Sequence, residues 1–217
     1  MFEYGGVKIS WLGHASFRLT NSKVVYIDPY QIKPAMPADI ILITHEHYDH
    51  CSVEDVRKIV KATTVIVTTA AVQDKLRNVE AQFLLMVPGK SYSIDGVKVE
   101  AVPAYNVNKF RSPDMPYHPE KDHKLGFIVT IEGIRIYHAG DTDLIPGLES
   151  YVKEIDVAMV PVSGTYVMTS EEAAKAVNMI TPKVAIPMHY GAIVGNERDA
   201  YNFEKRAKCK VEILKKE

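Results

Sequence analysis

The chain is poor in cysteine and carries no excess of charge of either sign. Its 217 residues include only two cysteines, Cys51 and Cys209, which are too few for a disulfide framework and favour a reducing compartment. With 26 basic and 27 acidic side chains, the formal net charge is -1. We therefore expect no basic surface for nucleic acid or for an anionic membrane, and the partner should be a small molecule.

Long hydrophobic runs are absent as well. No window approaches about eighteen uninterrupted apolar residues, so no membrane-spanning helix is expected. The first ten residues lack a basic segment followed by a long apolar run, and they do not resemble a signal peptide. No linker rich in proline, glycine or serine divides the chain. We predict a single domain over residues 1–217 and a cytoplasmic location.

Apolar patterning predicts strands along most of the chain. Residues 7–12 alternate between apolar and polar, as in a half-buried strand, whereas residues 40–43 form the continuous apolar run of a strand covered on both faces. Asp95-Gly96 and Glu132-Gly133 predict the turns of two hairpins. Further strands are predicted within residues 15–20, 22–29, 63–69, 155–162, 183–187 and 210–214.

Capping patterns predict where two helices begin. Ser52 precedes Asp55 by three residues, and Thr169 stands in the same relation to Glu172, ahead of apolar positions at helical spacing. Residues 70–78 and 198–209 predict two further helices. Strands outnumber helices, and their order predicts an α+β fold of two packed sheets with helices outside them. Only residues 105–124 have no clear period; a polar stretch of this length is either a binding loop or lid, or a mobile surface loop.

Three histidines and two acids crowd the end of the apolar run at residues 40–43. His45 and His47 are two apart, so their side chains leave an extended backbone on the same side. Asp49 and His50 follow at once, and a loop bending over the strand end would bring all four together. Neutral imidazoles with a carboxylate suit zinc, iron or manganese, whereas without a metal their desolvation would be costly.

Residues 44–50, THEHYDH, resemble the T-H-x-H-x-D-H signature of the metallo-β-lactamase superfamily. WLGHASF, YIDP, IYHAGDTD and IPMHYG stand in the order in which that superfamily presents them, so the resemblance runs from Trp11 to Gly191. More narrowly, the chain is similar to the branch of L-ascorbate-6-phosphate lactonase-like hydrolases. The resemblance implies a four-layer αββα sandwich with a metal site at one edge.

Carried over position by position, the resemblance implies two divalent ions, with Zn²⁺ favoured over Mn²⁺ or Fe²⁺. One pair of ligands, His45 and His47, belongs to the first ion, and Asp49 with His50 belongs to the second. Asp141 resembles the carboxylate that bridges the two ions. His189 resembles the last histidine ligand of the second ion.

The sequence departs from the superfamily at one ligand. A third histidine usually serves the first ion after a strand near the middle of the chain, but Asn106 stands at that place. An amide oxygen is a poor substitute for imidazole on zinc. Either Asn106 ligates, or His118 or His123 reaches in from the long loop, or the first ion is weakly held. We expect His118, with Asn106 as the next candidate.

Four further residues lie close to these motifs. His14 falls where the superfamily places a histidine near the pocket, so the resemblance makes it a catalytic candidate together with Asp49; a structural role is the alternative. Asp28 either orients a ligand histidine through its second ring nitrogen or caps the turn at Pro29. Cys51 and His138 are interpreted as buried structural residues.

The resemblance implies a metal-dependent hydrolase. A hydroxide held between the two ions would attack an ester, a lactone or a phosphodiester of a small molecule, with Asp49 orienting it. Lys109 and Arg111 in the long loop are candidates for binding an anionic group, and solvated loop charges are the alternative. Two other functions stay open, a metal-binding sensor or scaffold and a mononuclear iron redox enzyme. The oligomeric state is left open.

Overall fold

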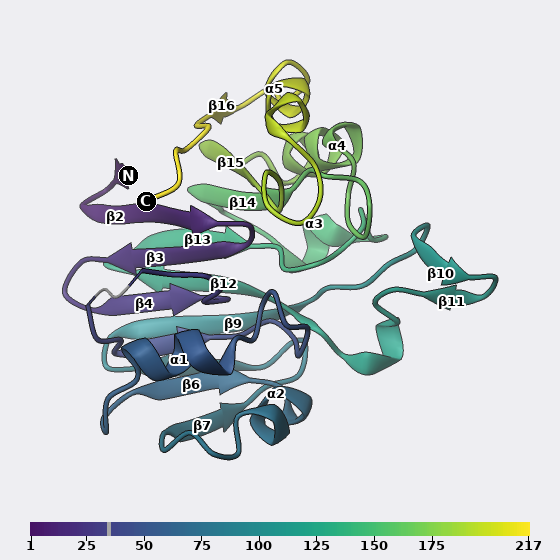
Figure 1. Ribbon diagram of the computed structural model, residues 1–217. Coiled ribbons are helices and arrows are strands. Elements are labelled where there is room, and N and C mark those ends of the chain that lie inside the picture. The colour runs from purple at the N-terminus through teal and green to yellow at the C-terminus, as the bar shows by residue number, and fades with distance from the viewer. Residues whose placement is uncertain (34–35) are drawn as a thin grey trace. The chain divides into compact units, whose positions relative to one another are not determined.

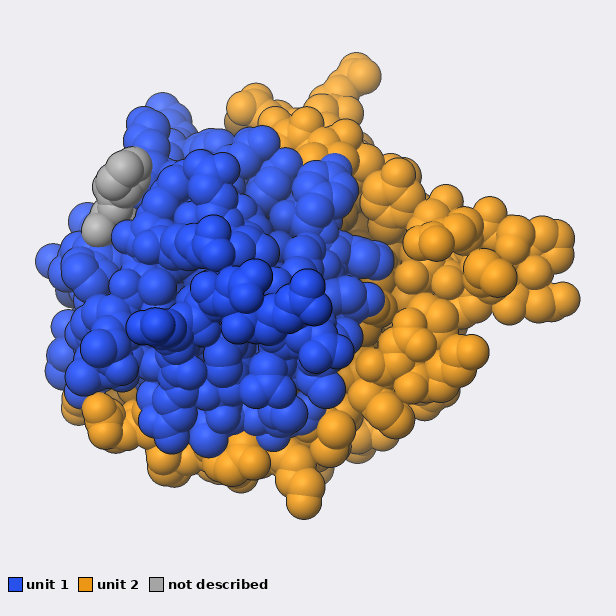
Figure 2. All heavy atoms as spheres, turned by 60° about the horizontal axis from the view of Figure 1, so that its bottom comes forward, with its two compact units in different colours: residues 1–86, 214–217 blue, residues 87–213 orange. Residues whose placement is uncertain are grey.

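The computed structural model describes residues 1–33 and 36–217 of the chain. Two compact units make up the fold (Figure 2). Unit 1 comprises residues 1–86 and 214–217, and unit 2 comprises residues 87–213. The prediction of one domain stays a prediction. Within the described residues, no helix combines the length and the apolar character needed to cross a membrane.

Unit 1 is built on a seven-stranded sheet whose strands follow the chain order (Figure 1). The first four strands are antiparallel neighbours, and the last four run parallel to one another. The strands are β1 (Phe2–Tyr4), β2 (Val7–Gly13), β3 (Ser16–Thr20), β4 (Val24–Ile27), β5 (Ile40–Leu42), β6 (Val65–Thr68) and β7 (Gln82–Leu85).

Two helices connect the parallel strands of unit 1, as parallel pairing requires. Helix α1 (Val53–Ile59) follows β5, and helix α2 (Ala70–Lys75) follows β6. The predicted start of α1 is confirmed, because the Ser52 hydroxyl accepts a hydrogen bond from the Asp55 N–H. Ile41, Val56 and Val72 meet in a buried apolar core, which fixes β5 and the loop that leaves its end.

Unit 2 contains a second seven-stranded sheet, in the order β16-β15-β14-β13-β12-β9-β8. The three strand pairs from β13 to β16 are parallel, and the pairs from β8 to β13 are antiparallel. The strands are β8 (Ser91–Ile94), β9 (Val97–Pro103), β12 (Leu125–Ile131), β13 (Ile134–His138), β14 (Val157–Pro161), β15 (Val184–Met188) and β16 (Lys210–Val211).

Turn and capping signals predicted several features of unit 2 correctly. Both hairpin turns are present, and Asp95-Gly96 and Glu132-Gly133 all have positive φ, as the tight turns between twisted strands require. Helices α3 (Leu148–Tyr151), α4 (Ser170–Ile180) and α5 (Glu197–Glu204) occupy the parallel connections. The predicted capping box of α4 between Thr169 and Glu172 is confirmed.

The structure differs from the sequence prediction at several short elements. Strands β1 and β7 and helix α3 were not predicted, since each spans at most four residues and carries few buried positions. The last strand covers only Lys210–Val211 rather than residues 210–214. The polar stretch at 105–124 holds a small hairpin, β10 (Phe110–Ser112) and β11 (Met115–Pro116), and a 3₁₀ turn, η1 (Glu120–Asp122). The hairpin projects from the sheet of its unit (Figure 1).

Candidate metal centre

The ligand loop of unit 1 leaves the end of β5 and turns into α1. Its backbone is closed by two hydrogen bonds to the His47 carbonyl, from the N–H of His50 and the N–H of Cys51. Strand β5 is buried and lies between parallel neighbours β4 and β6. A buried strand therefore anchors a tight turn that carries the histidines.

Asp28, at the end of β4, fixes the ring of His50. It is fully buried, and its Oδ2 lies 2.7 Å from His50 Nδ1 and also accepts a 2.7 Å hydrogen bond from the Thr44 hydroxyl. A carboxylate can only accept, so His50 Nδ1 carries the proton and Nε2 carries the lone pair that binds metals. The orienting role predicted for Asp28 is thus present in the geometry.

The same carboxylate reaches His45 through Thr44. Because the Thr44 hydroxyl donates to Asp28, it accepts at 2.9 Å from His45 Nδ1–H, which places the lone pair of His45 on Nε2. That nitrogen lies 3.0 Å from His47 Nδ1. The rings of His47 and His50 have their centroids 4.6 and 4.2 Å from the ring of His45. Three imidazoles therefore converge at one end of the unit 1 sheet.

His14 contacts the fourth predicted ligand of this loop. Its Nε2 lies 2.9 Å from Asp49 Oδ2, and the same oxygen is 3.7 Å from His50 Nε2. His14 is 1% exposed and has a φ of 52°, while the Trp11 indole N–H donates to its carbonyl. A catalytic role for His14 stays a prediction; in this structure its ring holds the Asp49 carboxylate.

In unit 2, Asn106 and His118 are bound to each other. Asn106 Oδ1 accepts a 2.8 Å hydrogen bond from the His118 N–H and lies 2.8 Å from His118 Nδ1. The Asn106 N–H donates in return to the His118 carbonyl, also at 2.8 Å. Both side chains are buried. Two of the three candidates for the third ligand thus hydrogen-bond to each other, and which residue binds the ion stays a prediction.

The Asp141 carboxylate lies between two imidazoles of unit 2. Its Oδ1 is 3.2 Å from His189 Nε2, and its Oδ2 is 3.5 Å from His118 Nε2. Asp141 follows β13 after a two-residue turn, and His189, with a φ of 61°, follows β15 directly. The Ser163 hydroxyl lies 3.1 Å from His189 Nδ1 and orients that ring. Asp141, His118 and His189 are each at most 4% exposed.

The predicted anion-binding residues have partners within unit 2. The Lys109 ammonium lies 2.8 Å from Glu172 and 3.2 Å from Asp143. The exposed Arg111 guanidinium lies 5.7 Å from the ring centroid of Tyr117. Both roles in substrate binding stay predictions. Asp143 was not singled out from the sequence, although it stands two residues after Asp141.

Glu172 has an unusual acidity because of its neighbours. Burial raises the pKa of its carboxyl, but hydrogen bonds from Lys109, from the Thr169 N–H and from Asn108 outweigh that effect and lower the pKa to about 2. The carboxylate therefore caps α4 and holds residues 108 and 109 of the long segment at the same time.

The side chains of Cys51, His138 and His123 are not among those that form the contacts described above. Cys51 packs in the unit 1 core, where burial raises the pKa of its thiol to about 12, and His138 is buried and accepts from the Gly140 N–H, as predicted for structural residues. His123 lines a hollow of about 240 Å³ with Tyr105 and Glu120.

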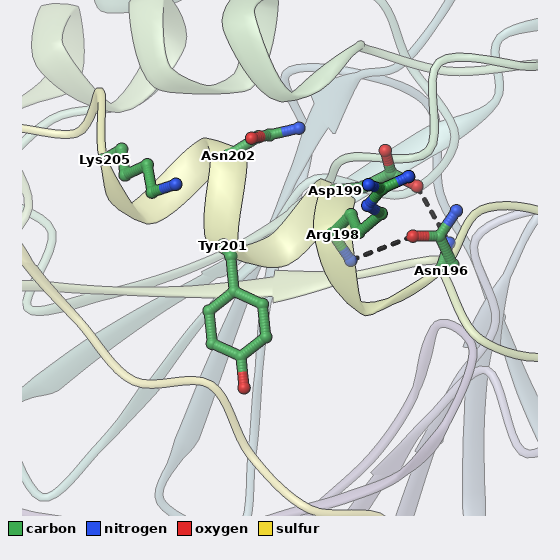
Figure 3. A pocket seen from close by; sticks show the side chains of 6 residues that line it. All are labelled: Asn196, Arg198, Asp199, Tyr201, Asn202 and Lys205. Atoms are coloured by element: carbon green, nitrogen blue, oxygen red, sulfur yellow. Dashed lines mark hydrogen bonds between the residues drawn. The ribbon is translucent and has the colours of Figure 1, made fainter.

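A more open hollow of about 710 Å³ lies along α5. Its lining in Figure 3 comes from side chains on or next to that one helix: Asn196, Arg198, Asp199, Tyr201, Asn202 and Lys205. The dashed contacts there are the capping box between Asn196 and Asp199 and the Asn196 bond to the Arg198 N–H. No histidine or cysteine belongs to this lining.

Each unit separately contains imidazole nitrogens and carboxylate oxygens that are suitable ligands for a divalent transition metal. Unit 1 offers three imidazoles and the Asp49 carboxylate, with Nε2 set as the ligand atom of His45 and His50 by Asp28. Unit 2 offers Asp141 between His118 and His189. Imidazole nitrogen and carboxylate oxygen are zinc ligands, and partners on the second ring nitrogen are usual in such sites.

The family model described as "Beta-lactamase superfamily domain" matches residues 8–189 of the chain. A UPF0173 metal-dependent hydrolase of Pyrococcus furiosus is 36% identical, with 96% of each chain covered. Another, of Thermococcus onnurineus, is 34% identical over 96% of this chain and 95% of its own. A crystal structure from Parabacteroides distasonis, provisionally described as a metal-dependent hydrolase, is similar to this chain with a TM-score of 0.82 and 34% sequence identity. The match covers 95% of this chain and 92% of that one.

Proposed function

Because the chain belongs to the metallo-β-lactamase superfamily and has its α+β fold, we propose that it is a metal-dependent hydrolase with two divalent ions. The observation that carries the proposal is the set of buried imidazoles whose ring orientation is imposed by hydrogen bonds. Asp28 orients His50, and Asn106 orients His118. Such support around ligand atoms is typical of functional metal sites.

We assign three imidazoles to the first ion and a mixed set to the second. His45, His47 and His118 would hold the first ion; Asp49, His50 and His189 would hold the second; and Asp141 would be a ligand of both. Assigning both groups to one binuclear centre follows the order of these motifs in the superfamily. We favour Zn²⁺, with Mn²⁺ or Fe²⁺ as alternatives. When bound, the ions supply a water of lowered pKa and an electrophile for the substrate oxygen.

The residues of the chain orient the reactants around that chemistry. The Asp49 carboxylate would accept a hydrogen bond from the attacking water and direct it toward the substrate carbonyl or phosphorus. His14, which donates to Asp49 Oδ2 at 2.9 Å, keeps that carboxylate in one orientation. A fixed acceptor reduces the reorganisation that the reaction requires.

We propose a small ester, lactone or phosphodiester as the substrate. Arg111 is exposed and is a candidate to bind an anionic group, such as a phosphate on a sugar. Lys109 is the weaker candidate because Asp143 and Glu172 already neutralise its charge. A rise in KM for phosphorylated substrates in Arg111→Ala, with no change for neutral ones, would support this assignment; equal KM values would count against it.

The test of the proposal combines metal content with hydrolysis. We expect about two equivalents of zinc or manganese in protein purified from its native host, and hydrolysis within panels of lactones, esters and phosphodiesters. His45→Ala should lose metal and activity. One equivalent of iron would favour redox chemistry, and no metal would favour a scaffold. Metal-loaded protein that is inactive across the panels, with His45→Ala behaving identically, would refute the hydrolase.

A further inference from the structure

We propose that Asn106 is a positioning residue that holds His118 as the third imidazole of the first ion, and is not itself a ligand. The inference rests on the proposed function, because it concerns a ligand of that centre. It explains how a chain with asparagine at the usual histidine position can still provide three imidazoles.

The orientation of the Asn106 amide is fixed by a bond on its other side. Its Nδ2 donates to the Tyr166 carbonyl at 2.9 Å. A carbonyl only accepts, so Nδ2 and Oδ1 cannot exchange places without facing two acceptors toward each other. Oδ1 is therefore the atom that faces His118.

Both lone pairs of that oxygen are engaged by His118. One accepts from the backbone N–H and the other from Nδ1, each at 2.8 Å. An amide oxygen has two lone pairs, so a metal could bind Asn106 only by displacing one of these bonds. Because Oδ1 accepts only, His118 Nδ1 carries the proton. Its Nε2, 3.5 Å from Asp141 Oδ2, is then the metal-binding atom.

Asn106 also holds His118 in position, although the two stand twelve positions apart in the sequence. His118 stands at the far end of an excursion that contains the β10–β11 hairpin, and an unattached ligand on such a segment would lose much conformational entropy on binding. The Asn106 N–H bond to the His118 carbonyl ties the two ends of the excursion together. Asp143 accepts from the N–H groups of Val107 and Asn108, which extends the attachment along the segment.

A double-mutant cycle tests the role of Asn106. Affinities for Zn²⁺ and Co²⁺ would be measured by chelator competition for wild type, Asn106→Ala, His118→Ala and the double variant. Asn106→Ala should lower the affinity for one of the two ions about 10- to 100-fold, as is usual when the hydrogen-bond partner of a ligand histidine is removed. The double variant should bind no more weakly than His118→Ala, because Asn106 acts through that ring. Additive losses would overturn the proposal.

Two further readouts make the test independent of activity. X-ray absorption of the Co²⁺ form should show the same number of imidazoles in Asn106→Ala as in wild type, and one fewer in His118→Ala. Loss of an oxygen ligand instead would identify Asn106 as a ligand and overturn the inference. Asn108→Ala is the matched control, since Asn108 lies on the same segment but donates to Glu172, and its metal affinity should equal that of wild type.

A conservative variant covers the case in which Asn106→Ala fails to fold. Asn106→Asp keeps an acceptor for His118 but loses the donor to the Tyr166 carbonyl, so we expect metal affinity to fall by no more than about tenfold. In the His118→Ala background the same change should have no effect. If wild type itself binds no metal, the proposed function fails; if wild type binds two ions and Asn106→Ala binds them equally well, only the positioning role fails.

Discussion

At the scale of single residues, one buried carboxylate sets the ring protonation of two candidate metal ligands in unit 1, His45 and His50. Asp28 accepts from the Thr44 N–H, from the Thr44 hydroxyl and from His50 Nδ1, and through Thr44 it also sets the proton of His45. Charged acceptors make the stronger hydrogen bonds in such networks. The protonation pattern of both imidazoles thus depends on a residue that is not itself among the candidate ligands.

Asp28→Asn should weaken metal binding while preserving the fold. Asparagine tolerates the positive φ of 46° at this position, but its NH₂ cannot accept from both Thr44 and His50. We expect affinity about 10- to 100-fold lower by chelator competition. Thr44→Ser keeps the hydroxyl and should bind like wild type. Wild-type affinity in Asp28→Asn would show that the ring proton of His50 is set elsewhere.

The residues that a sequence can predict are those whose partners are local. The cluster from His45 to His50 was predictable because one turn after one strand brings it together. His118 was only one of several candidates, because its place depends on an amide twelve residues earlier in the chain. The supporting contacts of Thr44 and Ser163 could not be predicted, since hydroxyl partners leave no pattern in a single sequence.

At the scale of elements, one carboxylate contacts both the start of helix α4 and the segment between Asn106 and His118. Glu172 closes the capping box with Thr169 and also binds Lys109 and Asn108. The helix start was predictable from the spacing of Thr169 and Glu172, whereas the attachment of residues 108 and 109 was not. Loss of this carboxylate should therefore loosen two elements together.

Glu172→Gln should lower the free energy of unfolding by about 1–3 kcal/mol at pH 7, measured by urea denaturation. The pKa falls from 4.5 to about 2 on folding, so the carboxylate stabilises the fold above about pH 4.5. That contribution is lost as the pH falls toward 2. Wild type should therefore lose more stability than Glu172→Gln over this window. Glu171→Gln, whose exposed pair with Lys175 is 3.1 Å long, should cost no more than about 0.5 kcal/mol.

Strand β12 includes a glycine where no side chain fits. A Cβ at Gly126 would lie 2.9 Å from the Ala139 carbonyl and 3.0 Å from that of His138, just before the turn that presents Asp141. Gly126→Ala should destabilise the fold by about 1–3 kcal/mol and weaken metal binding. Gly133→Asn is the control, because nothing lies within 4 Å and asparagine suits its positive φ. Equal metal affinity in Gly126→Ala and wild type would show that the turn absorbs the added methyl group.

At the scale of the whole molecule, metal binding should be visible in thermal stability. An ion that binds only the folded chain stabilises it by RT ln(1 + [L]/Kd), or about 2.7 kcal/mol at a hundredfold excess over Kd. We expect Tm to fall on removal of metal by chelator and to recover on addition of Zn²⁺. His50→Ala and Asp141→Asn should each remove this increment. An unchanged Tm after complete metal removal would contradict the prediction.

The hydrogen bonds between Asn106 and His118 have a consequence for evolution and for engineering. The chain leaves and returns at one fixed point, so the β10–β11 hairpin between them can be lengthened, shortened or exchanged without displacing the imidazole. The number of residues between His118 and the other motifs can then differ among related chains. A sequence search that requires a histidine at a fixed distance from those motifs would miss such relatives. The hairpin is also a natural place to graft new recognition loops.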